Sequence, residues 1–463
     1  MIQNIINAVP EGIWYLGILL TTILVWFLAI KRPVYEAIGI GFLLLVTISG
    51  TWGNIGTYVD AALSESLLYS MVAFVSMSIL LTKTKVVDSC IAIILSLIGR
   101  ITGGAGYAAV VASSFMGALS GSGPGNVMAT GTITIPAMKR SGFPAELAAN
   151  IESNASYMGN MIPPSANIAA ALLAYNMFAE KNNLTPIGDG QFWIILWGIA
   201  IYFIIQRLVM VWGFCKYYKV KPMAKEDLPS LKDTLKTGWS GLLLPVIILL
   251  PFILDYLLKD TFFTARLGAD GAKALSKSML LFIGGISAMY ACLTAKDKKV
   301  VKFQNIAKMF ADSVKTIAPT IGVCVFGYML GELFADLQVG EQMAAVISGW
   351  NFGMLGTVLI ICLITCFMGM VIPGSALVTT FGVVFIQVLA GVGCSPLLVA
   401  AMLPCICGVM CGITPPLGLG MYAGMTLAQS DFNKTFKNNL WWVAAQFIMQ
   451  VVVLMGWLPI MGL

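Results

Sequence analysis

Long apolar runs, separated by short polar or basic stretches, fill this chain from residues 14–30 to residues 441–458. A helix of about 20 apolar residues spans the hydrocarbon core of a bilayer, which is about 30 Å thick. No long polar stretch is left over for a soluble domain. The first run lacks a basic flank and a small-residue cleavage site, so we expect a retained helix rather than a signal peptide. The pattern predicts an all-α polytopic membrane protein.

Composition agrees with this fold class and excludes several functions. Of 463 residues, 59% are hydrophobic and only 10% are charged, whereas soluble domains carry about 25% charged residues. The chain has no histidine, the commonest general base and metal ligand. Its ten cysteines lie mostly inside apolar runs, where cysteine packs as a small apolar side chain. The net charge of +6 comes from basic residues near span ends, so we expect no nucleic-acid partner.

The lysine clusters predict the orientation of the spans. Basic residues near span ends mark the cytoplasmic side. Two clusters, at 216–236 and 296–308, are separated by two predicted spans, 238–258 and 277–295, and so fall on one side. All basic clusters then face the cytoplasm, provided that residues 104–137 and 353–390 enter the membrane and return without crossing. Both termini are then predicted to be periplasmic.

The two halves of the chain match at a constant offset of 252 residues. Met-Gly at 116–117 pairs with Met-Gly at 368–369, and Pro-Pro at 163–164 pairs with Pro-Pro at 415–416. The predicted span 14–30 runs inward and its partner, about 240–258, runs outward, so the repeats are predicted to be inverted. We divide the chain into a first repeat (1–213), a cytoplasmic basic loop (214–237) and a second repeat (238–463). Inverted repeats are typical of secondary transporters, whose sites lie at the midplane.

Two segments interrupt apolar arms that are too short to be separate spans. Residues 120–126 read Ser-Gly-Ser-Gly-Pro-Gly-Asn, and residues 372–375 read Ile-Pro-Gly-Ser. We predict that they are the tips of re-entrant helical hairpins at about 104–137 and 353–390. Irregular backbone at membrane depth is tolerated only inside protein or beside a water-filled cavity. Helix N-termini at these tips would carry N–H donors and partial positive charge, which suits an anion.

The proline pairs predict two broken helices, at about 146–176 and 397–426. Proline lacks an N–H donor and clashes with the preceding turn, so a pair of prolines frees several carbonyl groups. Together with the hydroxyls of Ser165 and Thr414, these carbonyls would form an oxygen cage for a small hard cation. One half-site of each kind per repeat predicts two cation sites flanking one anionic substrate. The alternative is an ordinary kink, because proline and glycine are common in membrane helices.

Acidic residues inside the apolar segments are few, and Glu152 and Glu332 are the candidates for functional carboxylates. Glu152 could serve a proton or a cationic substrate, or face a polar crevice near the cytoplasmic surface; we expect the crevice. With so few acids, sodium coupling through neutral oxygens is expected rather than proton coupling. The amphipathic stretches 86–101 and 341–352 are either arms that link a moving core to a frame or helices in the interface.

At these motifs the sequence resembles the large membrane subunit of tripartite ATP-independent periplasmic (TRAP) transporters. Gly-Ala-Leu-Ser-Gly-Ser-Gly at 117–123, followed by Thr-Ile-Thr-Ile-Pro-Ala-Met-Lys-Arg at 132–140, is similar to that family's first hairpin. Met-Ile-Pro-Pro-Ser at 161–165 and Ile-Thr-Pro-Pro at 413–416 resemble its two unwound segments. The resemblance covers roughly residues 70–460. The sequence at 125–132 is most similar to that of the branch whose substrate-binding proteins are of the TAXI type.

The resemblance implies an elevator mechanism driven by Na⁺ in the bacterial inner membrane, with no other cofactor. It also implies a periplasmic substrate-binding protein and a small four-helix membrane subunit as partners. The family's sodium ligands map here onto the neighbourhoods of Ser120, Ser122, Gly159, Ile162, Ser165, Gly369, Pro373, Gly374, Cys411 and Thr414. For contact with the substrate, a small organic anion and usually a carboxylate, we expect Ser122, Asn126, Ser375, Thr379 and Thr380.

The sequence departs from the family in two places. Gly-Pro-Gly at 123–125 crowds the first tip, and many members of the TAXI branch carry the small subunit fused to the large one. Nothing before Trp14 could supply it here, so we expect either a separate small subunit or a chain that works without one.

Three alternatives remain open at this stage. A stand-alone carboxylate or ion antiporter of the same architecture would need no binding protein. An intramembrane enzyme would require a clustered nucleophile and base or metal ligands, and the sequence contains no such cluster, so we expect no enzyme. A scaffolding membrane protein would not need paired broken helices.

Overall fold

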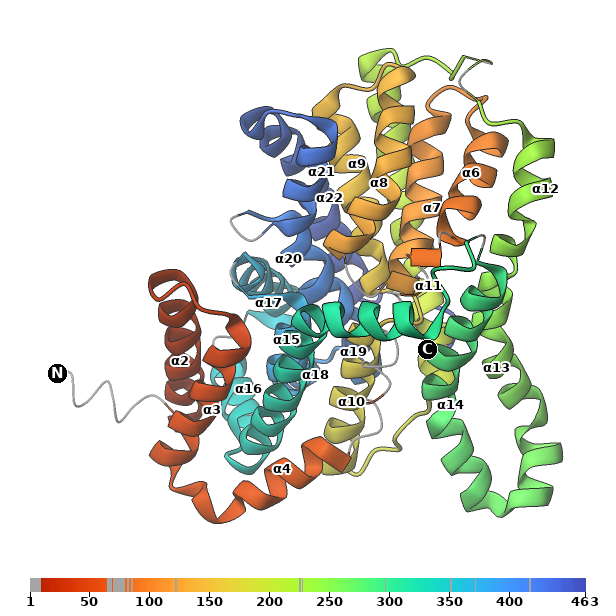
Figure 1. The fold of residues 1–463 in the computed structure, drawn as a ribbon. Coiled ribbons are helices and arrows are strands. Elements are labelled where there is room, and N and C mark those ends of the chain that lie inside the picture. The colour runs from red at the N-terminus through yellow and green to blue at the C-terminus, as the bar shows by residue number, and fades with distance from the viewer. Residues whose placement is uncertain are drawn as a thin grey trace.

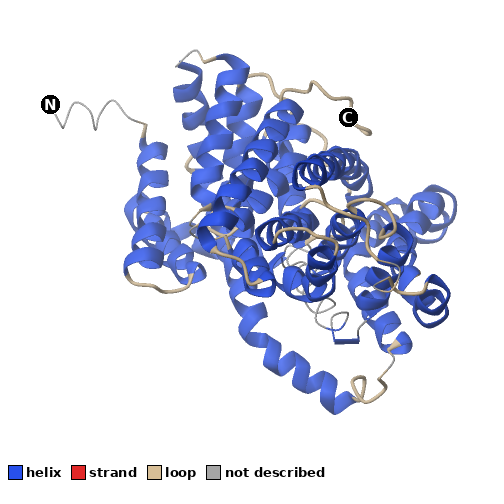
Figure 2. Ribbon diagram, turned by 90° about the horizontal axis from the view of Figure 1, so that it is seen from above, coloured by secondary structure: helices blue, strands red, loops and turns tan. Residues whose placement is uncertain are grey.

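The structure is a computed structural model, and it describes residues 10–64, 86–120, 123–224, 228–295, 297–349, 352–370, 372–415 and 418–463, with the single positions 69, 80, 83, 84 and 226. Within these residues the chain consists of helices and connecting loops, without strands (Figure 2). The predicted all-α fold is therefore confirmed. Three of the described helices are long and apolar enough to cross a bilayer by length and composition: Asp189–Tyr218, Gly374–Gly391 and Pro396–Ile413.

Helices follow one another in chain order with short connections. The first half contains α2 (Glu11–Leu24), η1 (Val25–Ala29), α3 (Val34–Ser49), η2 (Thr51–Asn54), α4 (Ile55–Ser64), α6 (Val86–Ile98), α7 (Gly104–Ser120), α8 (Gly123–Arg140), α9 (Ala145–Tyr157), η3 (Met158–Asn160), α10 (Ala166–Lys181) and α11 (Asp189–Tyr218). The second half contains α12 (Leu231–Leu242), α13 (Leu244–Leu258), η4 (Lys259–Phe263), α14 (Thr264–Thr294), α15 (Phe303–Asp336), α16 (Val339–Gly349), α17 (Gly353–Gly369), α18 (Gly374–Gly391), α19 (Pro396–Leu403), η5 (Pro404–Val409), α20 (Met410–Ile413), α21 (Leu419–Ala428) and α22 (Phe432–Leu454).

The centre of the molecule is built from elements that lie far apart in the sequence. Helices α7, α8 and α9 pack on one another, and α21 packs on α8 and α9. Helix α18 lies against α10, α15, α16 and η5. In Figure 1, α2–α4 lie on one flank of this assembly and α13–α14 on the other. The core therefore joins the second half of each predicted repeat.

Equivalent helices of the two halves begin at similar positions after the offset of 252 is applied. Helix α8 begins at Gly123 and α18 at Gly374; α9 begins at Ala145 and α19 at Pro396. Each of these pairs differs by 251 (374 minus 123, and 396 minus 145). That the halves are inverted, and that the pairs α7–α8 and α17–α18 enter and leave on one side, remain predictions.

Pro163, Pro164 and Pro415 lie where the chain leaves the helical path. Helix α9 ends at Tyr157, the short turn η3 follows, and α10 begins at Ala166. In the second half, η5 is a π-helix, α20 ends at Ile413, and Thr414 is extended before α21 begins. The peptide between Pro163 and Pro164 is cis. We call residues 158–165 the first break and residues 404–418, of which 416 and 417 lie outside the described residues, the second break.

The basic loop predicted at 214–237 is shorter than expected. Helix α11 continues to Tyr218, and α12 already begins at Leu231. The Ser230 hydroxyl accepts a hydrogen bond from the Asp233 amide at 3.4 Å, so a side-chain cap starts α12 within the lysine cluster. The amide of Lys221 donates to the Ser141 carbonyl oxygen at 3.2 Å. The cluster and the basic residues before Ser141 therefore lie at the same end of the molecule.

Cysteine labelling tests the predicted orientation. Thr185 precedes α11 and Lys221 follows it, and both are exposed; a helix of this length rises about 45 Å. Thr185→Cys is expected to react with a membrane-impermeant maleimide in intact cells, and Lys221→Cys only after lysis, with the unsubstituted chain as background. Labelling of Lys221→Cys from outside would contradict the topology.

Candidate functional site

In each half, a glycine lets an arm of the predicted hairpin lie directly on the broken helix. A Cβ on Gly117 of α7 would lie 2.4 Å from the Ser156 carbonyl oxygen and 3.1 Å from the Gly159 Cα. A Cβ on Gly369 of α17 would lie 3.2 Å from the Cα of Cys411. The two pairs are equivalent by sequence offset (369 minus 117, and 411 minus 159). A side chain would clash with the backbone at Gly117 and would crowd it at Gly369, so both halves position an arm of the predicted hairpin on a break in the same way.

The second hairpin tip is tied to the second break through Cys411. The amide of Gly374 donates to the Cys411 Sγ atom at 3.1 Å, and that thiol donates to the Gly408 carbonyl oxygen at 3.2 Å. A Cβ on Gly374 would lie 2.4 Å from the Gly408 Cα. The structure thus brings together Gly369, Gly374 and Cys411, three of the predicted sodium-site positions.

The two breaks meet through Asn160. Its side-chain amide donates to the Gly408 carbonyl oxygen at 2.8 Å, and its own carbonyl oxygen accepts from the Ser165 hydroxyl at 3.0 Å. No sequence motif assigned a role to this asparagine, because its partner lies 248 residues away. Asn160 therefore joins the first break to the second.

The Tyr157 ring packs between α8 and the second break. A Cβ on Gly123, Gly412 or Gly420 would lie within 2.4 Å of its ring. Gly123 begins α8, Gly412 lies within α20 in the second break, and Gly420 is the second residue of α21. The tyrosine ring thus packs against the start of α8, the second break and the start of α21. No sequence pattern marked this residue, because the glycines that receive its ring are far from it along the chain.

Several carbonyl groups of the second break are already held by side-chain amides. Asn439 donates to the Ile413 carbonyl oxygen at 2.5 Å, and Gln450 to that of Cys405 at 3.2 Å. The Thr414 hydroxyl donates to the Met410 carbonyl oxygen at 2.7 Å. A hydroxyl that donates in this way keeps its lone pairs, and so can still present oxygen to a cation.

The predicted substrate contacts do not all lie at the breaks. Ser375 follows Gly374 at the start of α18 and is partly exposed. Asn126 is buried, and its amide donates to the Ser113 carbonyl oxygen at 2.8 Å, which joins α8 to α7. The Thr379 side chain packs against Gly327 of α15. Thr380 is buried, and its hydroxyl has no hydrogen-bond partner among the described residues.

For the other predicted site residues the structure gives mainly the position along the chain. Ser122 lies outside the described residues, and Ser120 ends α7. Ile162 is buried in the first break, so only its backbone could offer a ligand. Pro373 directly precedes α18.

We expected Glu152 to face a polar crevice near the cytoplasmic surface, but it does not. Its side chain is fully buried in α9. It accepts hydrogen bonds from the hydroxyls of Thr130 and Thr134 of α8 and, at 2.9 Å, from the Ser156 hydroxyl. The expectation was wrong because α8 covers this face of α9. Glu332 lies on α15 and is partly buried.

Arg207 is a buried charge that the sequence analysis missed, inside the apolar helix α11. Its guanidinium donates to the Asn154 carbonyl oxygen at 3.2 Å and to the Gln446 side-chain oxygen at 2.8 Å. The Gln446 amide in turn donates to the Cys405 Sγ atom at 3.0 Å. No carboxylate pairs with Arg207 in the part of the chain that the structure describes. Arg207 thus fixes α11 to both broken helices and to α22.

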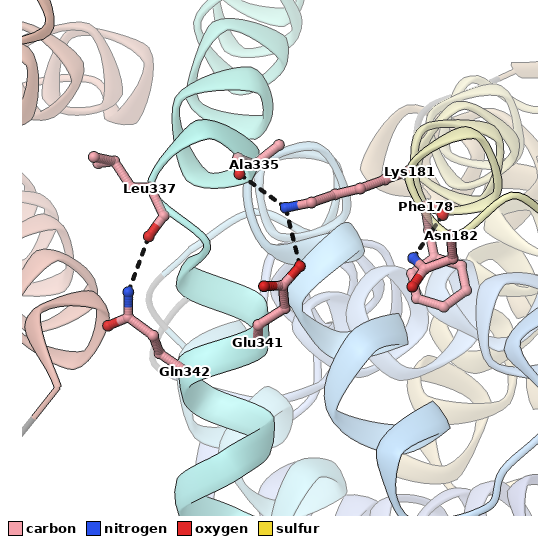
Figure 3. Close-up of polar contacts among 7 residues, drawn as sticks. All are labelled: Phe178, Lys181, Asn182, Ala335, Leu337, Glu341 and Gln342. Atoms are coloured by element: carbon pink, nitrogen blue, oxygen red, sulfur yellow. Dashed lines mark hydrogen bonds and ion pairs between the residues drawn. The ribbon is translucent and has the colours of Figure 1, made fainter.

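An ion pair joins α10 to α16 away from the breaks (Figure 3). The Lys181 ammonium lies 3.2 Å from the Glu341 carboxylate and donates to the Ala335 carbonyl oxygen at 2.9 Å. Beside it, the Gln342 side chain donates to the Leu337 carbonyl oxygen at 3.0 Å. Lys181 ends α10, the helix that follows the first break. This contact therefore links α10 to α15 and α16.

Arg207→Lys tests whether the shape of this side chain matters. Lysine keeps the charge but loses the planar fork that reaches several acceptors. Each buried acceptor left without a donor costs about 1–3 kcal/mol, so we expect a lower melting temperature for the detergent-purified protein. Arg266→Lys, at an exposed position of α14, is the matched control and should melt like the unsubstituted chain. Equal melting of all three proteins would show that Arg207 does not join these helices.

The chain matches a known transporter family over most of its length. The family described as "Tripartite ATP-independent periplasmic transporter, DctM component" matches residues 18–461. The C4-dicarboxylate TRAP transporter large permease protein DctM of Vibrio cholerae is 24% identical over 87% of this chain and 88% of its own length. The sialic acid TRAP transporter large permease protein SiaM of the same organism is 25% identical over 77% of each chain.

Solved structures share the fold at low sequence identity. MtrF of Neisseria gonorrhoeae, described as illuminating a class of antimetabolite efflux pumps, covers 90% of this chain and 86% of its own, with a TM-score of 0.63 and 14% identity. The YdaH transporter of Alcanivorax borkumensis covers 89% and 88%, with a TM-score of 0.57 and 14% identity. Because the family match spans nearly the whole chain, this protein belongs to the DctM family, the large membrane permease subunits of tripartite ATP-independent periplasmic transporters.

Proposed function

We propose that this chain is the subunit through which a sodium gradient drives uptake of a small organic anion across the bacterial inner membrane. A periplasmic substrate-binding protein would deliver the anion, and a small four-helix membrane subunit would complete the complex. Two relatives are C4-dicarboxylate and sialic acid permeases, which supports an acidic substrate. We also propose that the substrate-binding protein is of the TAXI type.

The observation that carries the proposal is the meeting of the two breaks. Asn160 joins them, the Tyr157 ring packs against the second break, and a glycine in each half brings an arm of the predicted hairpin onto the break. Backbone oxygens and two hydroxyls, those of Ser165 and Thr414, gather there. Oxygen ligands without full charge suit Na⁺, a small hard cation. We assign the two cation sites to the two breaks.

The anion would bind between the N-termini of α8 and α18. Helix N-termini carry unpaired N–H groups and partial positive charge, which favour carboxylates. Helix α8 begins at Gly123 beside the Tyr157 ring, and α18 begins at Gly374 beside Cys411. Ser375 is then the predicted substrate contact nearest to the second break. Binding of anion and cations at adjacent sites would couple their movement.

We further propose that the breaks and hairpins move together as an elevator. Helices α2, α3, α4, α15 and α16 would form the frame, and α15 meets the moving part at Gly327 beside Thr379. The ion pair between Lys181 and Glu341 crosses the same boundary. Such a pair would form in one position of the moving part and break in the other.

Uptake into proteoliposomes tests the function. The vesicles hold this chain with the binding protein and small subunit encoded by neighbouring genes, and labelled C4-dicarboxylate and sialic acid are the probes. Uptake is expected only with an inward Na⁺ gradient and only with the binding protein present. Uptake by this chain alone would make it a stand-alone carrier, and equal uptake on a proton gradient without Na⁺ would contradict sodium coupling.

Two substitutions test the cation assignment. Ser165→Ala and Thr414→Val each remove one oxygen from a break, and we expect the Na⁺ concentration for half-maximal uptake to rise about tenfold, equivalent to about 1.4 kcal/mol. Thr426→Val is the matched control, because that exposed hydroxyl makes the same kind of hydrogen bond to the carbonyl four residues earlier, at 2.9 Å. An unchanged Na⁺ dependence in both test variants would overturn the assignment.

A further inference from the structure

A second oxygen cluster surrounds Glu152, in addition to the breaks. The carboxylate is completely buried and receives three hydroxyl hydrogen bonds. The hydroxyl of Ser113 on α7 also faces it, and this buried oxygen makes no hydrogen bond of good geometry within the described residues. Oxygens from three helices, α7, α8 and α9, therefore converge on one carboxyl group. We call Glu152, Ser113, Thr130, Thr134 and Ser156 the Glu152 cluster.

The sequence places neutral residues at each position that the structure shows in contact with the Glu152 side chain. Helix α7 contributes Ser113, and α8 contributes the two threonines and Gly131, whose Cβ would lie 3.2 Å from the Glu152 Cγ atom. Helix α21 places Leu427 beside Gly131.

Two cations on neighbouring helices bind backbone oxygens and not Glu152. Lys139 of α8 donates to the Ala428 carbonyl oxygen, and Arg207 of α11 meets α9 at the Asn154 carbonyl oxygen. Helix α22 meets α9 through its asparagines: Asn438 accepts from Asn150 at 2.9 Å, and Asn439 accepts from Asn154 at 3.2 Å. Glu152 therefore has no ion-pair partner among the described residues. A buried charge without a partner is costly, so a role that supplies a positive charge is favoured.

The two threonine hydroxyls have a choice of acceptor. Thr130 can donate to Glu152 or to the Asn126 carbonyl oxygen at 2.8 Å, and Thr134 can donate to Glu152 or to the Thr130 carbonyl oxygen at 3.1 Å. Each hydroxyl carries one proton and two lone pairs. When no cation is bound, both hydroxyls donate to the carboxylate and stabilise it. When a cation occupies the cluster, both can turn to the backbone and offer lone pairs instead, so neither state leaves the hydroxyl donor of Thr130 or Thr134 unsatisfied.

From this arrangement we propose that the Glu152 cluster is a binding site for a small monovalent cation, either a proton on the carboxyl or Na⁺ among the oxygens. The site is separate from the two breaks and goes beyond the proposed function. It lies between α8, the second arm of the first hairpin, and α9, the helix that leads into the first break. Occupancy would neutralise a buried negative charge in the part of the molecule that is proposed to move. A fixed carboxylate that only joins two helices would bind no cation.

Infrared difference spectroscopy on the purified full chain tests the proposal, because protonated and ionised carboxyls absorb at different frequencies. One arm changes pH in choline salts without Na⁺, and the other adds NaCl at constant pH, with ²²Na⁺ binding measured in parallel. We expect a carboxyl signal in one arm that is absent from Glu152→Gln. A response to pH identifies a proton, and a response to NaCl together with one equivalent less of bound ²²Na⁺ in the variant identifies Na⁺.

Glu146→Gln, on the same helix and partly exposed, is the matched control and should keep the signal. If Glu152→Gln does not purify as a folded protein, Glu152→Asp replaces it, because the shorter carboxyl should shift the half-maximal cation concentration at least tenfold. The absence of any Glu152-dependent signal in both arms overturns the proposal. The measurement needs no substrate or partner, so a failed uptake experiment with an intact spectroscopic response would count against the proposed function alone.

Discussion

The backbone hydrogen bond is the constraint on which the rest of this structure depends. Inside a bilayer each unpaired N–H or C=O group costs several kcal/mol, so non-helical backbone persists only where protein or a water-filled cavity supplies partners. This chain interrupts two of its helices at proline pairs. Glycines pack the hairpin arms onto those interruptions, and Asn160, Asn439 and Gln450 donate to the carbonyl oxygens that the second break exposes.

The same constraint explains the polar residues in the interior. An amide or guanidinium in an apolar helix is itself expensive to bury, and here such groups satisfy backbone that would otherwise be unpaired. Arg207 serves the Asn154 carbonyl oxygen beside the first break, and through Gln446 it reaches Cys405 in the second. The breaks, the amides and the buried arginine therefore form one connected polar interior, which the apolar helices surround.

The sequence predicted the helical fold and the family, because hydrophobic periodicity and the proline and glycine motifs are local signals. It also marked Gly369, Gly374 and Cys411, which the structure brings together. It did not identify Asn160, Tyr157 or Arg207, because their partners are distant in sequence. Thr379 was expected at the substrate, yet it packs on α15, since the residues of one helix face different neighbours and sequence alone does not say which.

The central claim is that the two breaks hold the coupling cation. Equilibrium binding of ²²Na⁺ to the purified permease, without substrate or partners, tests it most directly, with a double variant carrying Ser165→Ala and Thr414→Val beside Thr426→Val. The account predicts saturable Na⁺ binding by the unsubstituted chain and by Thr426→Val, and much weaker binding by the double variant. Undiminished Na⁺ binding by the double variant, or no saturable binding by the unsubstituted chain, would contradict it.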